Sequence, residues 1–239
     1  MSTVSGEHEA EPHGAGLSAR LNWLRAGVLG ANDGIVSVAG IVIGVAGATA
    51  NITAIATAGV AGLVAGGMSM AGGEYVSVST QRDTERAVLE KERWELENLA
   101  DEELAELAGL YQAKGLTEDL ATQVAQQLTE HDALRAHAEA ELGINPDELT
   151  SPWAAAGASF LSFTVGALIP LLVILVPVGG WRIWLAVGAV LIGLTVTGFV
   201  SARLGGAPAG RAVLRNVGMG AATMAFTWGV GKAFGTVVH

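Results

Sequence analysis

The 239-residue sequence contains no cysteine, which excludes disulfide bonds, thiolate metal sites and cysteine nucleophiles. Charged residues are also scarce, at 15% of the chain against about 25% in soluble domains. Hydrophobic residues make up 51%, and the mean hydropathy is +0.45. These proportions favour a membrane protein with several spans over a globular enzyme.

The N-terminal region lacks the basic start and the apolar run of a cleavable signal peptide. Its polar, acidic composition predicts a disordered tail over residues 1–19. His8 and His13 in this tail are either solvated or weak metal ligands.

The few charges are gathered in one segment. Residues 81–149 hold 18 of the 23 acidic residues and 6 of the 13 basic ones. The segment has no long apolar run, and leucines at helical spacing give it only a thin apolar seam. We predict a soluble three-helix domain here, made of residues 81–99, 101–113 and 118–142, with Asp101 and Thr117 as N-caps.

Long apolar stretches lie on both sides of this segment, and each exceeds the roughly 20 residues that cross a bilayer. They predict an all-α membrane protein with five transmembrane helices, the acidic domain being inserted between the second and the third. Residues 20–80 hold the first two helices and residues 150–239 the last three. The five stretches are residues 23–48, 52–80, 153–178, 181–204 and 213–237.

Basic residues predict the orientation, because they favour the cytoplasmic side of a membrane. They precede the first stretch, follow the second and separate the fourth from the fifth. We therefore expect a cytoplasmic N-terminus and acidic domain, and an external C-terminus. The alanine- and glycine-rich composition favours a bacterial plasma membrane. So acidic a cytoplasmic face is an unfavourable surface for nucleic acid.

Ligand-type side chains recur on each predicted helix of the acidic domain at spacings of three or four residues, which share one helix face. Helical bundles build carboxylate-rich metal sites from such pairs, and ferrous iron and manganese suit oxygen ligands with an occasional imidazole. Solvated acidic faces have the same periodicity, so both interpretations stay open at this point. The pairs are Glu92 with Glu95, Glu103 with Glu106, and His137 with Glu141.

Asp33 and Glu74 are the only acids in the predicted spans, and intramembrane carboxylates usually mark functional sites. Asn32 and Asp33 could instead cap a helix at the interface, and Glu74 could lie at the cytoplasmic surface. Met70 is either a core residue or a thioether ligand beside these carboxylates. The GxxxG pairs, such as Gly40 with Gly44, fit close helix packing or a dimer.

Three motifs together resemble the vacuolar iron transporter family, and bacterial-type members in particular, from about residue 20 onward. They are Asn-Asp-Gly-Ile-Val-Ser at residues 32–37, Met-Ser-Met-Ala-Gly-Gly-Glu-Tyr at 68–75 and Glu-Leu-Gly at 141–143. The resemblance implies five membrane helices, a homodimer with the ion path at the subunit interface, and a cytoplasmic helical metal-binding domain.

The resemblance also implies that ferrous iron, and often manganese, leaves the cytoplasm in exchange for protons. The family's pattern assigns metal binding to Glu92, Glu95, Glu103, Glu106 and Glu141, and it places a membrane aspartate and methionine at Asp33 and Met70. His137 stands where a plant member has methionines. That member also has a carboxylate at a different position of the second span, and Glu74 is a candidate for its role here. No prosthetic group is expected.

We therefore predict a divalent-metal/proton antiporter rather than an enzyme, with metal ions, protons, the lipid bilayer and a second copy of the chain as partners. The main alternative is a membrane-anchored ferritin-like protein that stores or oxidises iron. A scaffold whose acidic domain binds a basic partner is a third possibility.

Overall fold

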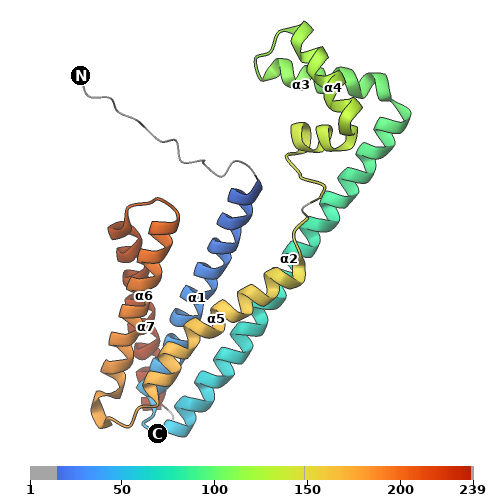
Figure 1. Cartoon of the computed structure of the whole chain (residues 1–239). Helices are drawn as coiled ribbons and strands as arrows, with labels where there is room; N and C mark the ends of the chain where they lie inside the picture. The colour runs from blue at the N-terminus through green and yellow to red at the C-terminus, as the bar shows by residue number, and fades with distance from the viewer. Residues whose placement is uncertain (1–14, 148, 238–239) are drawn as a thin grey trace, which may run out of the picture. The chain divides into compact units, whose positions relative to one another are not determined.

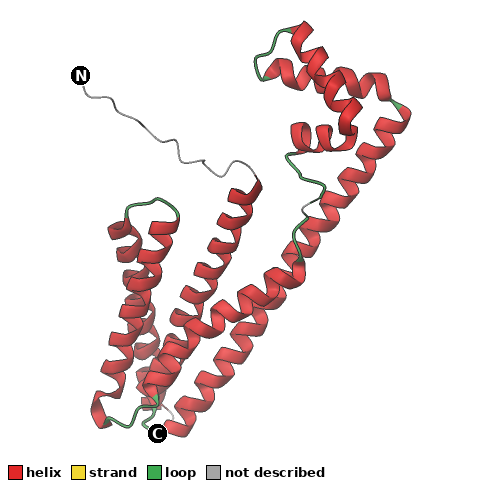
Figure 2. Ribbon diagram, viewed as in Figure 1, coloured by secondary structure: helices red, strands yellow, loops and turns green. Residues whose placement is uncertain are grey.

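The computed structural model describes residues 15–147 and 149–237, and all regular structure within them is helical (Figure 2). Most of the predicted tail, including His8 and His13, lies outside the described residues. Residues 15–19 are helical. In chain order the elements are α1 (Ala15–Ala48), α2 (Ile52–Asn98), α3 (Ala100–Ala113), α4 (Glu118–His137), the π-helix η1 (Ala138–Leu142), α5 (Pro152–Ile174), the 3₁₀ turn η2 (Gly179–Trp181), α6 (Arg182–Leu204) and α7 (Ala209–Val237).

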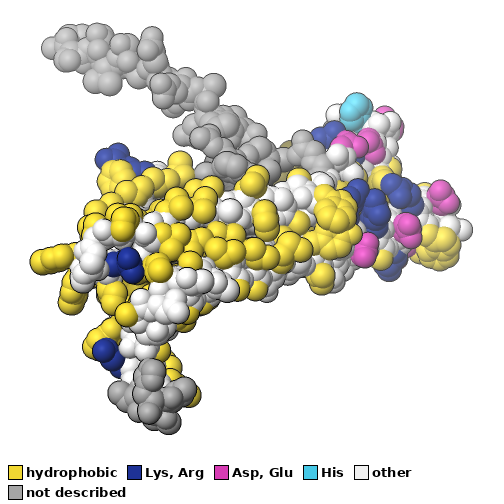
Figure 3. Space-filling view, turned by 90° about the horizontal axis from the view of Figure 1, so that it is seen from below, with side chains coloured by type: hydrophobic (Ala, Val, Ile, Leu, Met, Phe, Trp, Pro, Cys, Tyr) yellow, Lys and Arg dark blue, Asp and Glu magenta, His cyan; other side chains and the backbone are white. Residues whose placement is uncertain are grey.

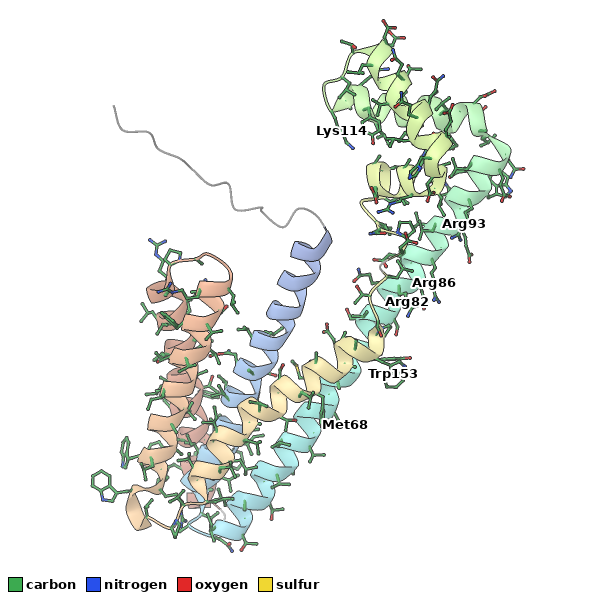
Figure 4. All side chains as sticks on the ribbon, in the orientation of Figure 1. Met68, Arg82, Arg86, Arg93, Lys114 and Trp153 are labelled. Carbon is green, nitrogen blue, oxygen red and sulfur yellow. The ribbon has the colours of Figure 1, made fainter. Side chains whose placement is uncertain are left out.

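Contacts divide the chain into two compact units, Met1–Tyr75 with Trp153–His239, and Val76–Pro152. The long helix α2 contributes to both. Its first part is apolar and carries Met68, whereas Arg82, Arg86 and Arg93 follow along its second part (Figure 4). The second apolar stretch and the predicted helix over residues 81–99 thus form one continuous helix.

The first unit has an apolar core built by α1, α2, α5, α6 and α7. Helices α1, α6 and α7 contact one another pairwise (Figure 1). Side chains from four helices fill the centre: Ile35 from α1, Ile55 from α2, Phe163 from α5 and Leu194 from α6 are almost fully buried. Close van der Waals packing of these side chains holds the helices of the unit together.

Glycines bring the helix backbones of this unit unusually close together. A Cβ atom at Gly231 of α7 would collide with the carbonyl oxygen of Gly44 on α1, and one at Gly34 of α1 would collide with the carbonyl oxygen of Phe163 on α5. Gly40 faces threonines of α7, and Gly62 faces Ile41 of α1. These contacts within one chain account for the GxxxG pairs, which therefore carry no evidence for a dimer.

Among residues 15–147 and 149–237, four helices are long and apolar enough to cross a membrane: Gly27–Ala48, Ile52–Asn98, Pro152–Ile174 and Gly179–Leu204. Helix α7, which the sequence predicts as the fifth span, forms but is less apolar, because glycine, threonine and basic residues interrupt it. Hydrophobic side chains cover much of the visible surface in Figure 3, and the acidic side chains in that view are gathered together rather than scattered among them.

The second unit holds the end of α2 together with α3, α4 and η1. Its core is thin: Leu107 packs with Ala108, Ala125 and Ala136, and the partly buried Leu104, Leu110 and Leu128 pack against them. Leu120 is exposed. The prediction of Asp101 as N-cap is wrong, since α3 begins one residue earlier after Leu99. Thr117 occupies the N-cap of α4 but makes no side-chain cap hydrogen bond within the described residues.

Candidate metal centre

Helices of the second unit bring four of the six predicted ligands together. Glu92 comes from α2, Glu103 from the first turn of α3, His137 from the last residue of α4, and Glu141 from η1. Glu92, Glu103 and His137 are 4%, 6% and 0% exposed, respectively. Charged or titratable side chains are rarely buried to this degree unless they are paired or bind a metal.

The ligand atoms converge on one point. One ligand atom each from Glu92, His137 and Glu141 lies within 4.8 Å of the other two. Nδ1 of His137 is 3.0 Å from Oε1 of Glu92 and 3.5 Å from Oε2 of Glu103. Despite this proximity, Oε1 of Glu92 and both ring nitrogens of His137 have no hydrogen-bond partner among the described residues. The ligands of a metal site have this arrangement: they are buried polar atoms that lie close together without forming hydrogen bonds to one another.

Burial and mutual repulsion shift the proton affinities of these groups. Burial, followed by repulsion from Glu141 and Glu103, raises the pKa of Glu92 to about 7. Burial likewise raises the pKa values of Glu103 and Glu141, with further repulsion from Glu106. Burial lowers the pKa of His137, against the opposing effect of Glu106. A divalent ion binds imidazole in its neutral form. It also stabilises the ionised form of carboxylates that burial and mutual repulsion disfavour.

Glu95 and Glu106, the other two predicted ligands, lie at the edge of this cluster. Glu95 accepts a salt bridge from Lys91 at 2.6 Å, and Glu106 is exposed. Both carboxylates nevertheless act electrostatically on Glu92. They therefore add negative potential to the site while the closest ligand atoms belong to other residues.

A π-helical turn positions the last ligand, and the sequence analysis missed it. The predicted helix over residues 118–142 ends its α-helical part at His137 and continues as η1, which Gly143 closes in the left-handed conformation at φ +65°. A φ of this sign strongly favours glycine. π-Turns occur preferentially at functional sites, but the Glu-Leu-Gly segment alone signals only a helix end.

Polar groups of the first unit lie within helices rather than at their ends. Asn32 and Asp33 are inside α1, which begins at Ala15, so the alternative that they cap a helix is wrong. Asp33 accepts a hydrogen bond of 2.9 Å from the Ser37 hydroxyl. Oδ1 of Asn32 is buried and has no hydrogen-bond partner among the described residues. Adjacent residues project from different faces of a helix, so these two oxygens are separate candidate ligands rather than a pair.

Met70 and Glu74 lie one turn apart on α2 and are both half-buried. Met70 packs against the apolar core that contains Ile35 and Phe163, so packing explains its position without a ligand role. No hydrogen bond or ion pair of Glu74 is recorded among the described residues. The structure thus leaves the roles of these two residues as predictions.

Four apolar helices and a separate buried cluster of carboxylates and imidazole define an integral membrane protein with several spans and a candidate metal centre. The chain matches the VIT family over residues 24–232 and belongs to that family. The family resemblance found in the sequence is therefore confirmed.

Named relatives agree with this assignment. A vacuolar iron transporter of Acanthamoeba castellanii is 47% identical, over 93% of this chain and 82% of that protein. Vacuolar iron transporter homolog 1 of Oryza sativa subsp. japonica is 37% identical, over 97% and 82%. Vacuolar iron transporter homolog 2 of Arabidopsis thaliana is 36% identical, over 91% and 87%. These names are those of transporters rather than enzymes.

Proposed function

We propose that this protein is a divalent-metal/proton antiporter that exports ferrous iron, and also manganese, from the cytoplasm. The observation that carries the proposal is the buried cluster of Glu92, Glu103 and His137 with Glu141 beside it, in a chain whose relatives are named iron transporters. Oxygen ligands with one imidazole suit both ions. Glu95 and Glu106 complete the negative potential that concentrates cations there.

The proposed topology has five spans, with α7 as the last one. An α7 of 29 residues exceeds the length needed to cross a bilayer, and its close contact with α1 and α6 lets its small polar residues face protein rather than lipid. Arg82, Arg86 and Arg93 then mark the cytoplasmic side together with the acidic domain. The protein lies in the plasma membrane of a bacterium, and its C-terminus is on the external side.

The proposed ion path uses Asp33 and Asn32, whose oxygens are available on α1, together with Met70 and Glu74 on α2. Cytoplasmic metal collected by the acidic domain passes to Asp33 and Glu74. Protons arriving from outside neutralise these carboxylates and release the metal, which couples the two fluxes in opposite directions. In the proposed homodimer both subunits supply these side chains.

Liposome transport tests the proposal directly. Purified protein is reconstituted with a metal-sensitive dye and a pH dye inside the vesicles, and ferrous iron, manganese or zinc is added across a proton gradient. We expect metal entry coupled to proton exit, and loss of both in Asp33→Asn. Asp119→Asn, an exposed aspartate of the acidic domain, is the matched control. Wild-type flux in Asp33→Asn would refute the proposed path.

The second candidate, a membrane-anchored ferritin-like iron protein, is favoured by the same convergence of helical carboxylates with an imidazole. It predicts oxygen-dependent oxidation of ferrous iron without any flux into liposomes. The Glu-x-x-His ligand pattern of that class is missing from residues 81–149. Measuring oxygen consumption and metal flux on the same preparation separates the two functions.

A further inference from the structure

The first unit contains an apolar cavity far along α1 from Asp33. Its volume is about 490 Å³, and it is lined by residues of α1, η2, α6 and α7. Ile43 and Met224 form its inner wall, while Trp184 and Trp228 stand at its partly exposed side. The volume falls within the range of sites that bind small molecules, about 300–1,000 Å³.

One lining residue is charged, namely Lys232 of α7. Its ammonium group lies 5.7 Å from the centre of the Trp228 ring. The described part of the chain records no ion pair for Lys232, and the only acids in the described first unit are Asp33 and Glu74. Since Asp33 precedes Ile43 by almost three helical turns, it is about 15 Å away along α1. Lys232 is exposed, so its ammonium can reach an anionic ligand at the mouth of the cavity, and an exposed ion pair of this kind adds up to about 1 kcal/mol.

The tryptophans indicate at which depth the cavity opens. Trp181 and Trp184 near the start of α6 are 72% and 69% exposed. Exposed tryptophans at the end of a span are typical of the interface between lipid tails and headgroups, and a lysine near a helix end extends its ammonium to the same level. The cavity therefore combines an apolar chamber at the depth of lipid tails with a cation at the depth of headgroups.

We propose that this cavity binds one acyl chain of an anionic phospholipid, whose phosphate pairs with Lys232. Trp228 supports the ammonium through its ring face, and the apolar walls from α1, α6 and α7 surround the chain. The bound lipid contacts three helices of the unit at once, so it stabilises their association.

Native mass spectrometry of the full-length protein in detergent tests the proposal, with phosphatidylglycerol and phosphatidylcholine of identical acyl chains as probes. We expect one retained lipid per chain and about a fivefold preference for phosphatidylglycerol, as one lysine near an anionic headgroup provides. Lys232→Gln abolishes the preference, and Lys232→Arg restores it. Arg203→Gln is the matched control, because Arg203 is also a cation over an aromatic ring, that of Phe199 at 5.2 Å, but does not line the cavity.

Variants that fill the cavity provide a second test of lipid binding. Ala225→Trp places a large side chain in the chamber, and we expect it to reduce retention of both lipids; Ala221→Phe serves if the first variant does not yield folded protein. A preference that survives Lys232→Gln would overturn the proposal, as would undiminished retention in both filled variants. Stronger retention of oleate than of phosphatidylglycerol would also overturn it in favour of a free fatty acid. A loss of dimer in the filled variants would assign the cavity to a subunit interface.

Discussion

Glu92→Gln is expected to stabilise the metal-free acidic domain while destroying its metal site. Glu92 is 4% exposed, and its pKa is raised from 4.5 to about 7 by burial and by the surrounding carboxylates. Because the pKa of Glu92 is higher in the folded state than in the unfolded state, the stability that this group contributes is fully present below pH 4.5. It is lost as the pH rises through 7. At pH 8 this ionisation lowers the free energy of unfolding by about 3 kcal/mol. A neutral glutamine at the same position avoids this loss.

Hydrogen exchange of the full-length protein measures this effect where it occurs. At pH 8 with a chelator, peptides from residues 100–142 of Glu92→Gln should exchange up to roughly 100-fold more slowly than those of the wild type. The difference should shrink as the pH falls from 7 to 4.5. The lowered pKa of His137 acts in the opposite direction on absolute stability, but it is common to both proteins and largely cancels in the comparison.

Two further conditions make the result decisive. Adding manganese should reverse the order, because binding stabilises only the protein that keeps its ligands. Glu90→Gln removes an exposed carboxylate of the same helix and should change the opening free energy by no more than about 0.5 kcal/mol. Equal exchange of Glu92→Gln and wild type at pH 8 would show that Glu92 is not a destabilising buried charge, and the derivation of the metal centre from its burial would fail.

The remaining predictions address affinity, helix contacts and the π-turn. Manganese affinity, measured by calorimetry, should fall by up to about tenfold per pH unit below pH 7, since the ion must then displace a proton from Glu92; a flat profile between pH 6 and 7 would contradict this. Gly231→Ala should prevent folding of the first unit or strongly lower its melting temperature through the collision with Gly44, whereas Gly229→Ala on the same helix, with open space around it, should be neutral or stabilising by about 0.5–1 kcal/mol. Gly143→Ala should cost about 1–2 kcal/mol at φ +65° and accelerate exchange of residues 138–144, while Gly109→Ala, in a helix and in open space, should not.

Composition and periodicity predicted the helices well, because long apolar runs and their glycine and proline boundaries are local signals. The helix end at Gly143 is confirmed. The apolar core of the acidic domain was harder to predict. Its buried alanines, Ala108, Ala125 and Ala136, allow close helix approach, but alanine is equally common on exposed helix faces and therefore carries little positional information.

The buried residues of the candidate site were equally hard to predict from the sequence. Spacing alone placed Glu92 with Glu95 and Glu103 with Glu106 on shared faces, yet it could not tell which member of each pair is buried. In the structure the first member of each pair turns inward, and Glu95 instead pairs with Lys91, four residues before it on the same helix. The choice depends on how α2, α3 and α4 meet, which is a tertiary property. The π-turn before Gly143 is likewise set by these contacts and has no residue signature of its own.

Under the proposed function, a site of this kind would bind a divalent ion reversibly, because its own protons compete with the metal. Ligands with ordinary carboxylate pKa values would stay ionised throughout the physiological range, and their affinity would hardly respond to pH. A pKa of about 7 at Glu92 leaves this carboxyl about half protonated at neutral pH, so that a metal ion competes there with a bound proton. Capture and release then require only a small change in proton or metal activity. Under the proposed function, the burial that destabilises the empty domain is thus the property that would suit it to pass an ion on rather than to store it.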